Sequence, residues 1–181
     1  HKAMSSALVD QARLEKLVDD LLLLAKVTDS GTQPTSRVQI HEIVETEVAA
    51  AGDPRVAVAW SGDLPVVSAD ERTLARVFRN LLDNARRHAH ESIRVSGSAS
   101  EGVITVEIED DGDGVPLADR GRIFDRFTRL DEARARQAGG SGLGLSIVRA
   151  AVEDLGGTVT VGDSALGGAS FSVMIPASAA A

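Results

Sequence analysis

Three short segments carry the polar residues and glycines of this chain that could do chemistry together. They are Asn-Leu-Leu-Asp-Asn at 80–84, Asp-Asp-Gly-Asp-Gly at 110–114 and Gly-Ser-Gly-Leu-Gly-Leu at 140–145. An asparagine carbonyl is a neutral oxygen ligand for magnesium, a carboxylate can accept a hydrogen bond from a nucleobase, and glycine amides before a helix can hold phosphate. Each segment alone is a weak signal, since short glycine patterns recur by chance. In combination they predict an ATP site.

The first segment lies on a long helix predicted over 70–89, with Asp70 as its N-cap. One face of this helix carries four polar residues at helical spacing: Asn80, Asn84, Arg87 and His88. We expect Asn84 to hold magnesium, with Asn80 beside it, because an amide oxygen adds no charge next to a triphosphate. Taken alone, this spacing is more typical of a solvated helix face, so only the other two segments favour a site.

Asp110 is the acidic residue whose side chain we expect to point into the protein. It follows an alternating apolar pattern in a strand predicted over 103–110, and it lies on the apolar face. A buried carboxylate is costly without a partner, and the exocyclic amino group of adenine would be a fitting donor. Gly112 and Gly114 would let the backbone turn closely around a ligand. The alternative is an acidic surface turn.

A calcium loop is a further interpretation of the same segment. Glu109, Asp111, Asp113 and Gly114 match the first half of such a loop. The position that requires a bidentate glutamate is Arg120, so we disfavour calcium.

The third segment precedes a helix predicted over 143–155, whose first amides and positive dipole end could hold phosphate. It is not a Walker loop, because no Gly-Lys-Ser/Thr follows. It is not a convincing dinucleotide-binding turn either, because no strand precedes it. As a lone element it would more often be a flexible turn.

A span of 25 residues, from Val115 to Gly139, separates the second and third segments. It contains six arginines and the apolar residues Ile123, Phe124 and Phe127. Loops of this length are uncommon unless they are functional or disordered. We interpret the span as an ATP lid, in which apolar residues dock the segment and arginines such as Arg126 meet phosphate. A solvated basic loop is the alternative.

The bulk properties of the chain limit its class. Its 181 residues suit one core of about 100–150 residues plus an accessory element. A net charge of -8 disfavours nucleic acid as a partner. The absence of cysteine excludes a disulfide framework and suits the cytoplasm. No segment approaches the ~20 apolar residues of a membrane span, and aromatic residues are only 3%, so we expect an aliphatic core in which Trp60 has a packing role.

The remaining pattern alternates short strands and helices. A helix with one apolar stripe is predicted from residue 5 to 27, followed by a linker. Further strands are predicted at 37–40, 56–60, 65–68, 93–98, 158–161 and 169–175, and a further helix at 41–51. We therefore predict an α+β fold: a two-layer α/β sandwich whose mixed, mostly antiparallel sheet is covered by helices on one face, with an N-terminal helix.

The order of the three segments, together with Ile-Phe-Asp-Arg-Phe at 123–127, resembles the catalytic and ATP-binding domain of bacterial sensor histidine kinases, of the Bergerat-fold superfamily. The resemblance covers about residues 35–177, and residues 13–22 resemble the second helix of the dimerisation hairpin that precedes this domain. It implies a hairpin remnant and linker at 5–33 and a catalytic domain at 34–177.

The resemblance implies that the chain binds ATP and Mg²⁺. It also implies that the γ-phosphoryl group is transferred to a histidine, for relay to a response regulator. It implies that Asn84 holds the metal with support from Asn80, and that Asp110 recognises adenine. Arg87 and His88 would line the phosphate and ribose side. The pocket and lid would be shaped by Gly112, Gly114, Arg126, Gly140, Gly142, Leu143 and Gly144.

The acceptor histidine is where this sequence departs from the family. The family's His-Glu-x-x-Thr/Asn-Pro motif is absent, and the His-Glu pair at His41 lacks the proline and follows the linker. We therefore expect a cytoplasmic fragment that binds ATP but cannot phosphorylate itself. Its parent would be a longer homodimer that uses its own histidine-phosphotransfer domain and a response regulator, and whether that parent is anchored in the membrane stays open.

Three other functions stay open. A non-kinase ATPase of the same superfamily, like those of gyrase, mismatch repair and heat-shock chaperones, would need Asp70 or Asp83 in place of a catalytic glutamate. An anti-sigma-type kinase would phosphorylate serine on a partner protein. A degenerate domain used only for protein binding would have no affinity for ATP.

Overall fold

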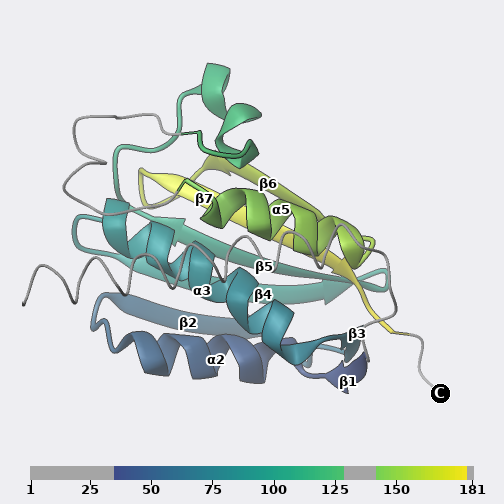
Figure 1. Ribbon diagram of the computed structural model, residues 1–181. Coiled ribbons are helices and arrows are strands. Elements are labelled where there is room, and N and C mark those ends of the chain that lie inside the picture. Colours follow the sequence, from purple (N-terminus) through teal and green to yellow (C-terminus); the bar gives the residue numbers. More distant parts are fainter. Residues whose placement is uncertain (1–34, 129–141, 179–181) are drawn as a thin grey trace, which may run out of the picture.

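The computed structural model describes residues 35–128 and 142–178, which form two layers (Figure 1). One layer is a five-stranded sheet in the order β2-β4-β5-β7-β6. Its strands are β2 (Val56–Ser61), β4 (Ile93–Ser100), β5 (Val103–Asp110), β6 (Thr158–Asp163) and β7 (Ala169–Pro176). β2 pairs with β4 in parallel, and the other pairings in this sheet are antiparallel. A small antiparallel sheet joins β1 (Ser36–Val38) to β3 (Val67–Ala69).

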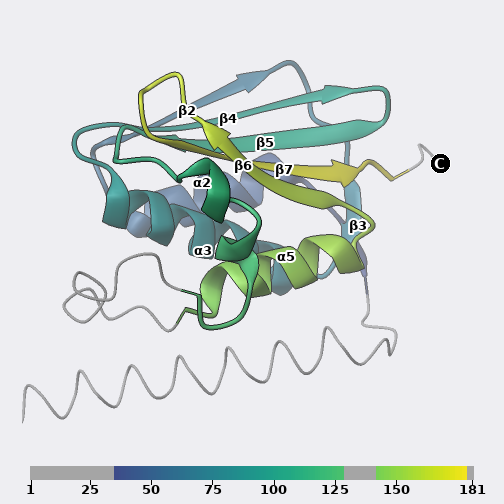
Figure 2. The same cartoon turned by 90° about the horizontal axis from the view of Figure 1, so that it is seen from above.

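The second layer consists of helices that cover one face of the large sheet (Figure 2). They are α2 (Ile40–Ala51), α3 (Glu71–His88) and α5 (Gly144–Asp154). This arrangement confirms the predicted α+β sandwich with a mixed, mostly antiparallel sheet. The predicted helix at 5–27, and with it the proposed unit at 5–33, lies outside the described residues.

α3 begins where its N-cap was predicted. Asp70 Oδ2 accepts hydrogen bonds from the backbone N–H of Thr73 at 3.2 Å and from its hydroxyl at 2.7 Å. The last turn carries Arg86, Arg87 and His88, and basic side chains there interact favourably with the helix dipole. Together these end signals explain why the predicted helix differs from α3 by only one residue at each end.

The start of α2 corrects one prediction. The strand predicted at 37–40 ends at Val38, and Ile40 is already the first residue of the helix. The buried residues of α2 are Ile40, Ile43, Val44 and Glu47. Their helical spacing places Ile40 on the buried face of the helix, so its burial there outweighs its preference for a strand.

The core lies between the layers and is aliphatic, as expected. Phe78 and Phe171 are among its largest fully buried side chains. Trp60 is half-buried and packs over Gly97, where a Cβ would come within 3.0 Å of the indole ring. Its predicted packing role is therefore confirmed. Within the described ranges, no helix combines the length and the apolar character needed to cross a bilayer.

Candidate nucleotide site

Asp110, the last residue of β5, is 1% exposed, and only one of its carboxylate oxygens is hydrogen-bonded within the described residues. Oδ1 accepts hydrogen bonds from the backbone N–H groups of Gly112 at 3.0 Å and Ala169 at 3.2 Å. Oδ2 is buried and finds no hydrogen-bond partner within the described part of the chain. A buried acceptor without a donor is costly, so this oxygen suits a donor that a ligand supplies. The predicted inward orientation of Asp110 is confirmed.

Glycines allow the backbone to close around this carboxylate. A Cβ on Gly112 would lie within 3.0 Å of the backbone carbonyl of His88, and a Cβ on Gly168 would lie within 3.0 Å of Oδ1 of Asp110. Gly114 has a φ of +72° and lies next to Gly168. The sequence analysis missed Gly168, although the Gly-Gly pair immediately before the last strand was a signal that could have found it.

Asn80 joins the first segment to the third. It is 8% exposed, and a Cβ on Gly144 would lie 3.3 Å from its Oδ1. Its Nδ2 is buried without a hydrogen-bond partner among the residues described. Asn84 follows one helical turn later and is half-buried. Of the three buried side-chain polar atoms without a partner in the described ranges, two therefore belong to predicted site residues, Asp110 and Asn80.

α5 begins at the glycine-rich segment. Its N-cap residue is the fully buried Leu143, whose side chain is apolar and caps no amide of the helix. Gly142 has a φ of +71°, and its carbonyl accepts a hydrogen bond from the backbone N–H of Phe127 at 3.0 Å. Gly140 lies outside the described residues. A helix N-terminus beside glycines suits phosphate.

The remaining predicted site residues have exposed side chains. Arg87 and His88 lie in the last turn of α3, where the His88 carbonyl packs against Gly112. Arg126 lies just beyond a short 3₁₀ turn, η2 (Arg122–Phe124). The structure thus brings Arg87 and His88 to the strand end that carries Asp110, while their contact with phosphate or ribose stays a prediction.

The span after Gly114 is only partly as predicted. Ile123 and Phe124 are buried at 7% and 6% exposure, and the Phe124 ring meets Phe171 edge-on at 6.3 Å. Phe127 was expected to dock with them but is 64% exposed. Its backbone has a φ of +62°, and its N–H donates to the carbonyl of Gly142 at 3.0 Å. Residues 129–141 of the predicted lid lie outside the described residues.

The calcium interpretation is not supported by the geometry. Glu109 pairs with Arg94 at 2.6 Å, and Asp111 accepts hydrogen bonds from the backbone. Arg120, in place of the required glutamate, pairs with Asp163. Across residues 35–128 and 142–178, no group of three His, Cys, Asp or Glu side chains is placed to hold a metal.

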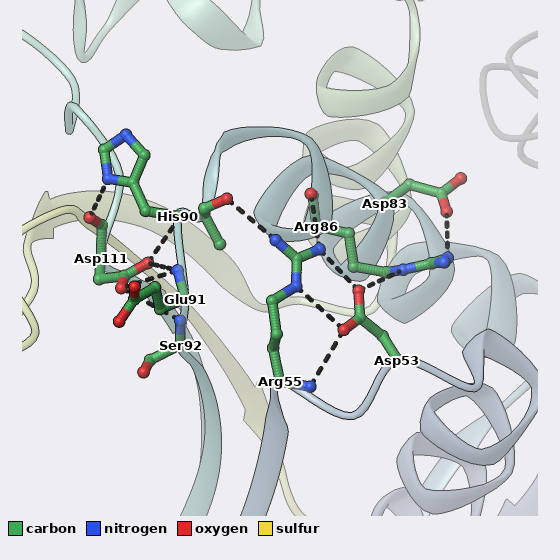
Figure 3. A network of polar contacts seen from close by, with 9 residues as sticks. Asp53, Arg55, Asp83, Arg86, His90, Glu91, Ser92 and Asp111 are labelled. Atoms are coloured by element: carbon green, nitrogen blue, oxygen red, sulfur yellow. Dashed lines mark hydrogen bonds and ion pairs between the residues drawn. The ribbon is translucent and has the colours of Figure 1, made fainter.

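A polar network that the sequence analysis missed holds the end of α3 (Figure 3). The Arg55 guanidinium donates to the carbonyls of Ala89 at 3.0 Å and Arg86 at 3.1 Å, and to both carboxylate oxygens of Asp53. The hydrogen bonds from Arg55 hold the pKa of Asp53 well below its usual value, and the same contact raises the pKa of Arg55. Their sequence positions, near a Pro between a helix and a strand, carry no distinctive signal.

Asp111 organises the next part of the chain. Its carboxylate accepts the backbone N–H groups of His90 at 2.8 Å, Glu91 at 3.0 Å and Ser92 at 3.1 Å (Figure 3). Burial alone would raise the pKa of Asp111, but the N–H groups of Ser92, Glu91 and His90 together lower it. The charged carboxylate is therefore the form that the fold favours.

Comparison with known proteins shows the family of this chain. The model of the histidine kinase-, DNA gyrase B-, and HSP90-like ATPase family matches residues 69–179. The probable sensor histidine kinase TcrY of Mycobacterium tuberculosis is 39% identical over 183 residues, which cover 96% of this chain and 38% of TcrY. The sensor protein RstB of Escherichia coli is 34% identical over 172 residues, which cover 92% of this chain and 40% of RstB.

A solved structure shows the same fold. Full-length ShkA in complex with AMPPNP superposes with a TM-score of 0.74 at 30% identity, over 93% of this chain and 37% of ShkA. The chain thus spans 38% and 40% of the length of the two curated relatives.

Proposed function

Because this chain belongs to the family of histidine kinase-, DNA gyrase B-, and HSP90-like ATPases, we propose that it is the ATP-binding catalytic core of a sensor histidine kinase. It transfers the γ-phosphoryl group of Mg-ATP to a histidine outside these 181 residues, for relay to a response regulator. The observation that carries the proposal is Oδ2 of Asp110, which is buried and unpartnered within the described residues. It offers one acceptor to the amino group that adenine carries.

The site residues divide the recognition of the nucleotide between them. Asp110 accepts from the adenine amino group, and guanine, which has a carbonyl oxygen at that place, is disfavoured because two acceptors would meet. Nδ2 of Asn80 donates to a ligand oxygen, and the first amides of α5 hold phosphate. Asn84 holds magnesium, which when bound supplies neutralisation of the phosphate charge.

Phosphoryl transfer relies mainly on positioning and on charge. The lone pair of the neutral acceptor imidazole forms the phosphorus–nitrogen bond while the bond between the γ-phosphorus and its bridging oxygen breaks and ADP leaves. The proton on the other imidazole nitrogen passes to solvent. Arg87 and Arg126, whose side chains are exposed, supply positive charge on the phosphate side. His41, which lacks the family's proline, packs edge-on against Trp60 at a centroid distance of 6.2 Å, and we do not propose it as the acceptor.

The contacts of Asp70 and Asp83 disfavour a clamp-type ATPase, which would need one of these carboxylates as its catalytic base. Asp70 caps the N-terminus of α3 through Thr73, at the opposite end of the 18-residue helix from His88. Asp83 lies 3.8 Å from the guanidinium of Arg86. Asp70 is thus remote from the last turn of α3, and Asp83 lies within ion-pair distance of Arg86; both contacts favour the kinase over the clamp-type ATPase.

The partners follow from this role. The acceptor histidine belongs to the dimerisation and phosphotransfer domain of the parent, which acts as a homodimer, and the response regulator receives the phosphoryl group. We place this part of the parent in the cytoplasm.

A labelling experiment with two arms tests the proposal. The chain, alone or mixed with the acceptor hairpin of its parent, is incubated with Mg²⁺ and ATP labelled at the γ-phosphate. We expect acid-labile label on the hairpin and none on the chain alone. Steady hydrolysis without transfer would favour a clamp ATPase, acid-stable label on serine would favour a serine kinase, and either result would refute the proposal.

A further inference from the structure

The connection between α3 and β4 links the two halves of the proposed site. α3 carries Asn80 and Asn84, and β5, the strand next to β4, ends at Asp110. A nucleotide that touches both elements requires a fixed position of α3 relative to β5. The residues that connect α3 to β4, and so fix this position, lie at 89–92, and none of them belongs to the three sequence segments.

One side of this connection is held by Arg55. It directly precedes β2, and its guanidinium reaches the carbonyls of Arg86 and Ala89 at the end of α3. Asp53 holds the guanidinium at 3.0 Å and 2.7 Å, and it also accepts from Arg86 Nε at 3.2 Å. The carbonyls at this end of the helix are therefore hydrogen-bonded to a planar guanidinium of fixed geometry rather than to solvent.

The other side is held by Asp111. Its carboxylate takes the N–H groups of three consecutive residues, His90, Glu91 and Ser92. His90 Nδ1 also lies 2.9 Å from the carbonyl of Asp111. Because Asp111 is adjacent in the chain to Asp110, these bonds fix the backbone from which the adenine-recognising carboxylate projects.

A third contact closes the arrangement. Gly112 packs so tightly against the carbonyl of His88 that a Cβ would not fit. Gly112 also donates its N–H to Oδ1 of Asp110. A shift of the backbone at 90–92 would therefore move both the end of α3 and the carboxylate of Asp110.

We propose that Asp111 is a positioning residue for the nucleotide, which holds the connection after α3 so that Asp110 meets the adenine amino group. It touches no part of the ligand and acts through Asp110. The inference rests on the proposed function and deepens it, because it assigns base discrimination to a residue beyond the ligand contacts. Displacements of about 1 Å are enough to weaken such recognition.

The test compares ATP with GTP, because partial unfolding lowers the affinity for both nucleotides equally and leaves their ratio unchanged. Calorimetry on the full chain with Mg²⁺ gives the Kd for each nucleotide. We expect Asp111→Ala to lower the preference for ATP about tenfold or more, since the charge-assisted hydrogen bonds from three backbone N–H groups are lost. Asp111→Asn keeps one acceptor oxygen, so its preference should lie between those of Asp111→Ala and the unmodified chain.

Asp70→Ala is the matched control. It removes the carboxylate that accepts two hydrogen bonds from Thr73 at the other end of the same helix. This variant should melt at a lower temperature but keep the unmodified preference for ATP over GTP. A preference that falls as much in Asp70→Ala as in Asp111→Ala would mean that Asp111 only stabilises the fold.

An unchanged preference in Asp111→Ala would overturn the inference. Should Asp111→Ala fail to fold, Asp111→Asn decides: a reduced preference supports the positioning role, and an unchanged one refutes it. Absence of ATP affinity in the unmodified chain would refute the proposed function itself, and this inference with it, before any variant is compared.

Discussion

Replacing Asp110 by asparagine separates recognition of adenine from folding. The neutral side chain has the same shape, and its carbonyl oxygen can keep the bonds from the N–H groups of Gly112 and Ala169, at 3.0 Å and 3.2 Å. The amide nitrogen then occupies the place of Oδ2. A donor therefore faces the adenine amino group, which is also a donor.

The loss of affinity follows from this reversal. A hydrogen bond to a charged group contributes about 1.5–3 kcal/mol, and leaving two buried donors facing each other costs about 1–3 kcal/mol more. At about 1.4 kcal/mol for each factor of ten, the Kd for ATP should rise about a hundredfold or more. The unliganded Asp110→Asn variant should melt no lower than the unmodified chain, because a buried charge with one unpartnered oxygen among the described residues has been removed.

Glu109→Gln is the control for this experiment. Glu109 is the neighbouring carboxylate, is 6% exposed and pairs with Arg94 at 2.6 Å on the opposite face of β5. Its carboxylate also accepts hydrogen bonds from the Ser164 hydroxyl at 3.2 Å and the Ala165 N–H at 3.3 Å. Glu109→Gln should therefore cost about 1–3 kcal/mol of stability and should leave ATP affinity unchanged. Calorimetry and thermal unfolding by circular dichroism measure both quantities. Unmodified ATP affinity in Asp110→Asn, or a loss fully explained by unfolding, would refute the assignment.

Three further changes test other parts of the argument. Asn84→Ala should reduce ATP affinity in Mg²⁺ to about the value measured in EDTA; a Mg²⁺ dependence that survives would remove Asn84 as the ligand. Gly168→Ala should lower stability by about 1–3 kcal/mol through overpacking and weaken ATP binding, since its Cβ would crowd Asp110; an unchanged melting temperature would contradict this. Folding lowers the pKa of Asp53 from its usual value of 3.8. The charged carboxylate therefore stabilises the folded state above pH 3.8, and this contribution is lost as the pH falls below 3.8 toward the lower pKa of the folded state. Asp53→Asn should therefore be less stable at neutral pH and show a flatter acid limb in a circular dichroism titration; an acid limb as steep as that of the unmodified chain would count against it.

Much of the architecture was predictable because local rules and tertiary packing agree. The end signals of α3 are an N-cap aspartate and basic last-turn residues, which act within a few residues of the chain. The alternation along β5 places Asp110 on the buried face whatever the neighbouring strands are. Ile40 was assigned to a strand because its local preference favours one, whereas its burial beside Ile43 and Val44 places it in α2.

The contacts that complete the site were less accessible from the sequence. Arg55 lies 34 residues before Ala89, whose carbonyl it binds, and Asp111 lies 21 residues after His90. Gly168, in the turn before β7, and Ala169, the first residue of β7, both reach Asp110. No periodicity connects such positions, because each contact depends on where the whole sheet brings two distant segments together.

By itself, the sequence determined the order of elements, the identity of the polar groups and the face on which each lies, because backbone periodicity and capping are local. Only the tertiary structure decided how the groups are used. It placed two N–H donors on Oδ1 of Asp110 and left Oδ2 without one in the described residues, and it brought Asn80 against Gly144. Hydrogen bonding and packing depend on distances of a few tenths of an ångström between remote segments, and only the folded chain sets those distances.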